Sequence, residues 1–303
     1  MSKKSNLRFD PPGLGWVRDL PDPKDYSQST IRRAKCFFPS VSDRAVSKTP
    51  KEPPTDFSCF FPEAECQRKG ENSSAAHACA AIFEYFHLRV NGYEMKFSKP
   101  FIYHNAQRYR GYQSELGVSI RDVFKTMKRF GAPSEQFFES KPAGIDDPFL
   151  YGFKSFFEDF EYFRLDDVEN KTIPLNLIKG FLESEIPIVF GISVPTGMKQ
   201  DGLFPYFPIT NAIVGGQCLV AVGFDDGVHF GHQIPKGAVL VRNSWGPDWG
   251  EQGFGWVPYR YFETGLVADC WVALDEAWLC SIEVKQRLVN ELFRIGSTGA
   301  FFR

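Results

Sequence analysis

The part of the chain after Pro187 constrains the fold more than any other feature of the sequence. It consists of short apolar runs separated by Gly, Asp or Pro, and these read PIVFGISV, QCLVAVGFDD, GAVLVRNSW and LVADCWVAL. Such runs are typical of β-strands bounded by turns. Before Pro187 the pattern favours helices. Helices followed by strands indicate an α+β fold, with a helical lobe at about residues 56–185 and a β-rich lobe at about residues 186–280.

Four segments in the first part of the chain carry helix signals. Ser73 or Ser74 is a predicted N-cap for a helix over residues 75–90. A second helix is predicted in SKPFIYHNAQRYRG, and a third begins after Ser119 and ends at Gly131. The segment PLNLIKGFLESEI predicts a fourth helix.

Both ends of the chain differ from this pattern. Residues 1–55 are rich in Pro, Lys, Asp and Ser, and proline disfavours helix, so we expect an extended arm and loop laid over the body. Residues 281–303 predict an amphipathic helix followed by a short tail. This end is a candidate binding surface for a protein partner, and the alternative is a helix docked on its own body. The apolar positions of this helix are Val284, Leu288, Leu292 and Phe293.

Composition and charge exclude several classes of function. The chain has 35 Lys and Arg against 37 Asp and Glu, a net charge of -2, which gives no electrostatic basis for binding nucleic acid or an anionic membrane. No stretch approaches the roughly 18 consecutive apolar residues of a membrane helix, and the first residues do not resemble a signal peptide. We therefore expect a cytoplasmic protein. Its seven cysteines lack CxxC spacing, so we expect free thiols, no metal and no cofactor.

The most specific motif of the chain is VLVRNSWGPDWGEQGFGWVPY, residues 239–259. It resembles the asparagine segment of papain-like cysteine peptidases, which has a strand, Asn-Ser-Trp-Gly, Trp-Gly and then Gly-x-Gly. In that family the asparagine accepts the N–H of the catalytic imidazole, and the tryptophan shields this hydrogen bond from water. The resemblance assigns these positions to Asn243 and Trp245.

Other stretches extend the resemblance over residues 14–275, with gaps. LGWVRDLPDPKDY is similar to the N-terminal arm of the prokaryotic-type branch, which lacks a long inhibitory propeptide. PFIYHNAQRYRGYQSELGVSIRDVFKTMKRFGAPSEQ resembles the next two helices of that branch, and GGQCLVAVGFDD resembles its histidine strand. The resemblance implies a papain-like domain at 56–280, with a helical left lobe, an antiparallel β-barrel-like right lobe and a substrate cleft between them.

The nucleophile motif of this family, usually Gln-Gly-x-x-Gly-Ser-Cys, is altered in CQRKGENSSAAHACAAIFEYF. Aligning the small-residue helix places Ser74 at the cysteine position, whereas counting from Gln67 selects Ser73. One inserted residue reconciles the two counts, and we prefer Ser74. Gln67 takes the position of the oxyanion-hole glutamine. Arg68 replaces the first glycine of the loop, so we expect Gln67 to be misplaced for that role.

The base position is altered as well, because GGQCL places Gln217 where the family has histidine. An amide has no useful basicity, and a serine hydroxyl without a base is a very poor nucleophile. His77, three residues after Ser74, is the one replacement base that the sequence offers near this position, and a packed histidine is the simpler interpretation.

These substitutions favour a catalytically inactive papain-like protein that acts as a binding or scaffold protein. Its partner would be a peptide or protein held at the cleft or at the C-terminal tail. Two alternatives stay open. One is an enzyme with altered chemistry in the same cleft, and the other is an engineered inactive form of a cysteine peptidase.

Overall fold

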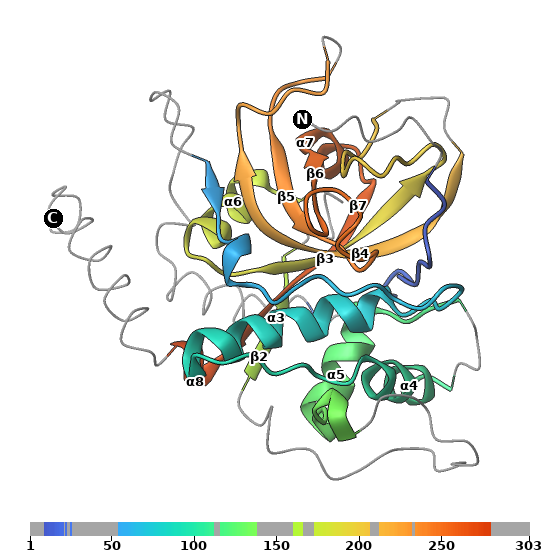
Figure 1. Cartoon of the computed structure of the whole chain (residues 1–303), viewed down its shortest axis with the longest axis vertical. Coiled ribbons are helices and arrows are strands. Elements are labelled where there is room, and N and C mark those ends of the chain that lie inside the picture. Colours follow the sequence, from blue (N-terminus) through green and yellow to red (C-terminus); the bar gives the residue numbers. More distant parts are fainter. Residues whose placement is uncertain are drawn as a thin grey trace, which may run out of the picture.

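The computed structural model describes residues 9–20, 22, 25, 54–111, 116–137, 160–165, 173–206, 212–231 and 234–279. One antiparallel sheet occupies the upper part of the molecule in Figure 1, and the first long helices lie below it. The predicted helix at 281–303 and most of the predicted loop before residue 54 lie outside the described residues.

The predicted helices are confirmed. They are α3 (Ser74–Asn91), α4 (Lys99–Tyr109), α5 (Ile120–Phe130) and α6 (Leu175–Glu183). The side chains of Ser98 and Ser119 accept hydrogen bonds from backbone N–H groups in the first turns of α4 and α5. Helix α3 ends at Gly92, which has a left-handed φ of 76° that glycine adopts without strain. Short helices η2 (Ser58–Phe60), η3 (Glu135–Phe137), α7 (Tyr259–Glu263) and α8 (Glu276–Leu279) complete the set.

The sheet contains the four predicted strands and three that the sequence patterns did not reveal. The predicted strands are β3 (Ile188–Pro195), β4 (Ile213–Asp225), β5 (Ala238–Arg242) and β7 (Val267–Asp275). The additional strands are β1 (Thr55–Asp56), β2 (Phe160–Arg164) and β6 (Phe254–Pro258). The strand order is β2-β7-β3-β4-β5-β6, and β1 pairs with β4. Strands β1 and β2 therefore join the sheet although they precede Pro187 in the chain.

The sheet does not close into the barrel-like form that we expected from the resemblance. Within the described residues, its two edge strands β2 and β6 do not pair with each other. The reason lies in the side chains of β2. Phe160 packs against Phe83 of α3 and Phe124 of α5, with ring centroids 4.7 Å and 6.3 Å away. This edge of the sheet is therefore turned toward the helices instead of toward β6.

Helices and sheet share one hydrophobic cluster. It runs from the aromatic side chains of α3 and α5 to the fully buried interior of β3, β4 and β7. Aromatic rings supply much of the contact between the layers, because each ring buries a large apolar area. Trp271 of β7, for example, lies with its ring centroid 6.4 Å from that of Phe124. The helices and the strands thus form a single packed body.

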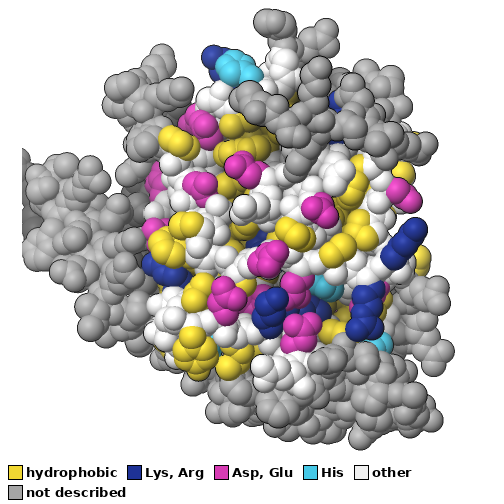
Figure 2. All heavy atoms as spheres, viewed as in Figure 1, with side chains coloured by type: hydrophobic (Ala, Val, Ile, Leu, Met, Phe, Trp, Pro, Cys, Tyr) yellow, Lys and Arg dark blue, Asp and Glu magenta, His cyan; other side chains and the backbone are white. Residues whose placement is uncertain are grey.

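The surface carries acidic and basic side chains side by side. On the face drawn in Figure 2, they alternate and do not gather into a large patch of one sign. Among the described residues, no helix is both long and apolar enough to cross a membrane.

A buried ion pair lies between α3 and α4. The Nζ atom of Lys99 is 2.7 Å from Oε1 of Glu84 and 2.8 Å from Oε2 of Glu65. Glu84 also accepts a hydrogen bond of 3.0 Å from the backbone N–H of Phe97. Only 1% of the Glu84 side chain and 4% of the Lys99 side chain are exposed. Charges so deeply buried are stable only when each retains its partners.

We predict that Glu84→Ala lowers the free energy of unfolding by about 3 kcal/mol, because it removes one partner of the buried Lys99 ammonium. Urea unfolding at pH 7 measures this loss. The matched control is Glu263→Ala, which breaks the solvent-exposed pair that Glu263 forms with Arg260 at 2.9 Å. The control should leave stability nearly unchanged. Equal effects of the two substitutions would contradict the prediction.

Candidate functional site

Ser74 is the first residue of α3, and its hydroxyl faces strand β4. The backbone N–H of Cys218 donates a hydrogen bond of 3.1 Å to the Oγ atom of Ser74. Ser73, the N-cap, directs its hydroxyl elsewhere, toward the Nδ1 atom of His77 at 3.2 Å. Of the two serines that the sequence left open, Ser74 is therefore the one that contacts the strand of Gln217. Both serines are fully buried.

Gln217 and Asn243 lie side by side on β4 and just after β5. The Nε2 atom of Gln217 donates to Oδ1 of Asn243 over 2.8 Å and lies 3.1 Å from Oγ of Ser244. The backbone N–H of Ser244 also donates to Asn243 Oδ1, at 2.8 Å, which fixes this atom as an acceptor. Gln217 must therefore present its amide nitrogen here. Asn243 thus accepts an N–H from the amide of Gln217, at the position where the resembling family has an imidazole.

Two polar atoms of this pair have no hydrogen-bond partner among the described residues, namely Oε1 of Gln217 and Nδ2 of Asn243. Both side chains are buried, with 0% and 2% exposure. A carboxamide oxygen accepts hydrogen bonds but is far too weak a base to remove a proton from serine. No carboxylate or imidazole of the described residues hydrogen-bonds the Ser74 hydroxyl.

The amide group of Gln67 is engaged by backbone carbonyl oxygens and by Ser244. Its Nε2 atom donates to the carbonyl oxygens of Leu14 and Glu71, at 2.9 Å and 2.7 Å. Carbonyl oxygens only accept, so both N–H bonds of the amide are directed at these two atoms. Its Oε1 atom accepts from the Ser244 hydroxyl at 2.7 Å. In this state the amide of Gln67 has no N–H left to donate to a negatively charged oxygen.

Trp245 lies against the N-terminal arm, which we define as residues 9–20. Its indole N–H donates to the carbonyl oxygen of Gly13 over 2.9 Å. The ring of Phe9 lies 5.3 Å from the Trp245 ring, centroid to centroid. The sequence predicted an arm over the body, but it did not predict that the arm would contact Gln67, Ser74 and Trp245. The glycines Gly13, Gly15, Gly215 and Gly216 were the available signal, because they permit close approach of two backbones.

His77 is directed toward Ser73 and away from Ser74. Its Nδ1 atom is 3.2 Å from both the hydroxyl and the carbonyl oxygen of Ser73. Burial, together with the positive charge of Lys99, lowers the pKa of His77 to about 4. The imidazole is therefore neutral at pH 7 and is hydrogen-bonded within its own helix.

Cys218, which follows Gln217, is also unsuited to nucleophilic chemistry. Its side chain is 1% exposed, and burial raises the pKa of its thiol well above the ordinary value. A protonated thiol is a weak nucleophile, because the thiolate is the reactive form. Within the described residues there is also no group of three or more His, Cys, Asp or Glu side chains arranged to hold a metal ion.

Comparisons with known proteins connect this geometry to one group of proteins. No protein-family model matches the chain. An uncharacterized peptidase C1-like protein of Acanthamoeba polyphaga mimivirus is 28% identical over 290 residues, which span 86% of each chain.

Solved structures agree with that sequence relationship. Xylellain, a cysteine protease from Xylella fastidiosa, superposes with a TM-score of 0.61 at 23% identity, over 89% of this chain and 98% of its own. Digestive procathepsin L 3 from the larval midgut of Tenebrio molitor has a TM-score of 0.52 at 17% identity, over 79% of each chain. The chain therefore has the papain-like fold, and its homologue and structural neighbours are papain-like cysteine peptidases.

Proposed function

We propose that this protein is a catalytically inactive papain-like protein that binds a peptide or protein partner at the site around Ser74, Gln217 and Asn243. One observation carries the proposal. The Nε2 atom of Gln217 donates to Asn243 Oδ1 over 2.8 Å. The amide of Gln217 therefore occupies the position at which removing a proton from the nucleophile requires an imidazole.

A second observation supports the same conclusion from the other side of the site. Both N–H bonds of the Gln67 amide are directed at backbone carbonyl oxygens, those of Leu14 and Glu71. Stabilising a tetrahedral intermediate requires donors aimed at the developing negative charge. The site thus lacks the proton acceptor and also the side-chain donor that acyl transfer needs.

An enzyme with altered chemistry is the second candidate, and His77 is the residue that would carry it. Its distance of 3.2 Å to Ser73 makes a Ser-His pair within α3. The pair is buried, and the low pKa of His77 makes it a weak base. These features favour a structural role for the pair. An engineered loss of activity would give the same geometry, and the natural coding sequence at positions 74 and 217 distinguishes that case.

We predict that the purified protein does not hydrolyse broad fluorogenic peptide substrates above the buffer rate. Ser74→Ala should give the same result as the unmodified chain, because the Ser74 hydroxyl has no base to activate it. The matched control is Ser73→Ala. Turnover that disappears in the Ser74 variant and persists in the Ser73 variant would identify Ser74 as a nucleophile and refute the proposal.

We predict that the double substitution Ser74→Cys and Gln217→His does not restore peptidase activity. Its rate should remain about 10²-fold or more below that of an active papain-like peptidase on the same substrate, because loss of one oxyanion donor costs ~10²–10³ in rate. Steady-state hydrolysis by the double variant and by each single variant measures this. Robust turnover by the double variant would mean that Gln67 exchanges its partners freely.

We predict that His77 makes folding sensitive to acid. The folded-state pKa is about 4 and the ordinary value is 6.5, so between these pH values the unfolded chain binds a proton that the folded chain does not. The stability associated with neutral His77 is thus fully present above pH 6.5 and is lost as pH falls toward 4. His77→Gln should reduce this loss by up to about 3 kcal/mol.

Urea unfolding of both proteins at pH 7 and pH 4.5 measures this difference. An identical acid dependence in the two proteins would show that His77 is not buried in its neutral form. Under the proposed function, His77→Gln also leaves the hydrolysis of peptides at background, whereas a catalytic Ser73–His77 pair would make the substitution abolish measurable turnover.

A further inference from the structure

The arm contacts the body through backbone hydrogen bonds on both of its sides. The N–H groups of Gly15 and Trp16 both donate to the carbonyl oxygen of Gly216 in β4, at 2.9 Å and 3.1 Å. On the other side, Val118 donates to Gly15 over 3.0 Å and accepts from Val17 over 3.1 Å, between backbone atoms. The arm is therefore held by one carbonyl oxygen of β4 on one side and by a short parallel bridge to Val118 on the other. Backbone hydrogen bonds of this kind can hold an extended peptide, and side chains then supply the specificity.

Glycines let the arm approach this closely. A Cβ atom on Gly216 would lie 2.7 Å from the Trp16 ring, and one on Gly191 of β3 would lie 1.9 Å from it. On the arm, Gly15 has a φ of 131° and a Cβ atom there would lie 2.1 Å from the Asn72 carbonyl oxygen. Two strands of the sheet thus leave a flat surface on which the Trp16 indole rests, and side chains at 191 or 216 would displace it.

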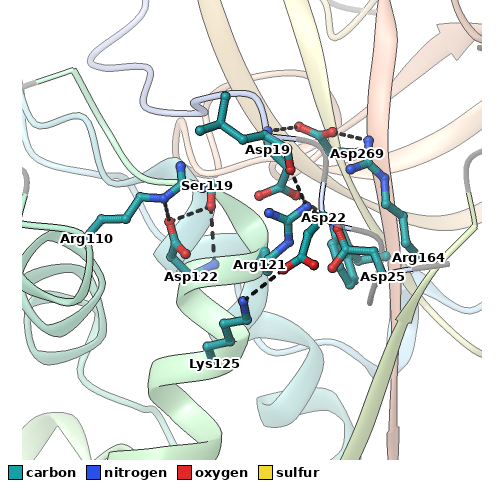
Figure 3. Close-up of polar contacts among 12 residues, drawn as sticks. Asp19, Asp22, Asp25, Arg110, Ser119, Arg121, Asp122, Lys125, Arg164 and Asp269 are labelled. Atoms are coloured by element: carbon teal, nitrogen blue, oxygen red, sulfur yellow. Dashed lines mark hydrogen bonds and ion pairs between the residues drawn. The ribbon is translucent and has the colours of Figure 1, made fainter. Parts of the chain in front are cut away.

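The buried carboxylate of Asp269 accepts hydrogen bonds from two groups of the arm. The Oδ2 atom of Asp269 accepts from the indole N–H of Trp16 at 3.1 Å and from the backbone N–H of Asp19 at 2.7 Å. Its Oδ1 atom accepts from Arg164 of β2 at 2.5 Å. Asp269 is completely buried. Two hydrogen bonds to this carboxylate therefore come from the arm, and they fix the spacing between Trp16 and the residue three positions later. Figure 3 shows Asp269 between Asp19 and Arg164.

The end of the arm is held by the body through a second set of polar contacts. The Asp19 carboxylate accepts from the indole N–H of Trp271 at 2.8 Å. Arg121 of α5 donates to the Leu20 carbonyl oxygen at 2.7 Å and pairs with Asp25. Arg121 is 2% exposed and Asp19 is 6% exposed. Burial raises the pKa of the Asp19 carboxyl, and the positive charge of Arg121, which lies close by in Figure 3, opposes that shift.

We propose that this surface is a recognition site for an extended peptide carrying the pattern Gly-Trp-x-x-Asp, and that residues 15–19 fill it in cis. The inference rests on the proposed binding function of the same site, and it names the chemistry of the ligand. The tryptophan of the pattern packs against Gly191 and Gly216 and donates to Asp269. The aspartate of the pattern accepts from the indole N–H of Trp271. A peptide from a partner protein binds there by replacing the arm.

The alternative is that the arm is a fixed strand of the fold. The position of the arm argues for a ligand-like role. Its carbonyl oxygens at Gly13 and Leu14 accept hydrogen bonds from Trp245 and Gln67, which are two of the five positions that the resemblance assigns to the site. The backbone N–H of Ser74 also donates to Leu14, over 3.2 Å. The arm therefore lies across the candidate site itself.

The test uses the full chain with a specific protease site inserted between residues 45 and 46, outside the described residues. After cleavage the arm is attached only by its contacts, and a fluorescent peptide of residues 9–22 is added in excess. Anisotropy reports its uptake by the folded protein, and circular dichroism monitors folding. We expect uptake by the cleaved protein and at least about tenfold weaker binding by the uncleaved protein, whose own arm competes.

Peptide variants then test the pattern without altering the protein. We expect peptides with Trp16→Ala or Asp19→Ala to bind about tenfold more weakly or worse, because truncating a buried anchor typically costs that much. The matched control peptide has Arg18→Ala, since Arg18 is exposed and lies between the two anchors. It should bind like the natural sequence.

Three outcomes would overturn the recognition site. They are no uptake while the cleaved protein remains folded, permanent retention of the cleaved arm without exchange, and equal affinities of all four peptides. Mass spectrometry of the bound peptide separates this inference from the proposed function. Uptake of a peptide that stays intact supports both. Uptake followed by hydrolysis would support recognition and refute the absence of catalysis, whereas no uptake and no hydrolysis would refute recognition alone.

Discussion

The buried carboxylate of Asp269 is the point on which the arrangement of three distant segments depends. A carboxylate without exposed surface is stable only when donors replace its lost hydration. Asp269 receives them from Arg164 in β2 and from Trp16 and Asp19 in the arm. The same requirement holds the edge strand β2 beside β7 and keeps the arm at the junction of the sheet and the helices. The arm therefore passes the candidate site because the buried carboxylate of Asp269 needs the donors that the arm supplies.

Hydrogen bonds join four polar side chains of the candidate site, although Oε1 of Gln217 and Nδ2 of Asn243 have no partner among the described residues. Ser244 donates to Gln67, and Gln217 donates to Asn243 and lies within hydrogen-bond distance of Ser244. A group that already has internal partners offers little to a substrate, because binding must first break a buried hydrogen bond. The ion pair of Lys99 and Glu84 has both of its partners outside the arm, whereas the amide of Gln67 depends on a carbonyl oxygen of the arm.

Local rules were sufficient for the helices and four strands, whereas the grouping of the site residues came from the family resemblance. N-cap serines and C-terminal glycines act within one turn, so the limits of α4 and α5 follow from the sequence. The direction of the Gln67 amide does not, since its acceptors include Leu14, 53 positions away. Strand β2 was missed because its five residues pair with β7, which lies far later in the chain, and no local pattern reports such a pairing. The His77 contact with Ser73 was within reach, because residues four apart share a helix face.

The hydrogen bonds of Gln67 also bear on how such a protein changes over evolutionary time. Codons 74 and 217 each need only a few nucleotide changes to encode cysteine and histidine. Their effect would depend on a third, unlinked condition, namely that the carbonyl oxygen of Leu14 releases the Gln67 amide. This is epistasis imposed by a main-chain atom, which substitutions at positions 74 and 217 leave in place. Under the proposed function, a lineage that keeps this arm regains peptidase chemistry only if the backbone of the arm moves as well, so changes of the two side chains alone bring no benefit on which selection could act.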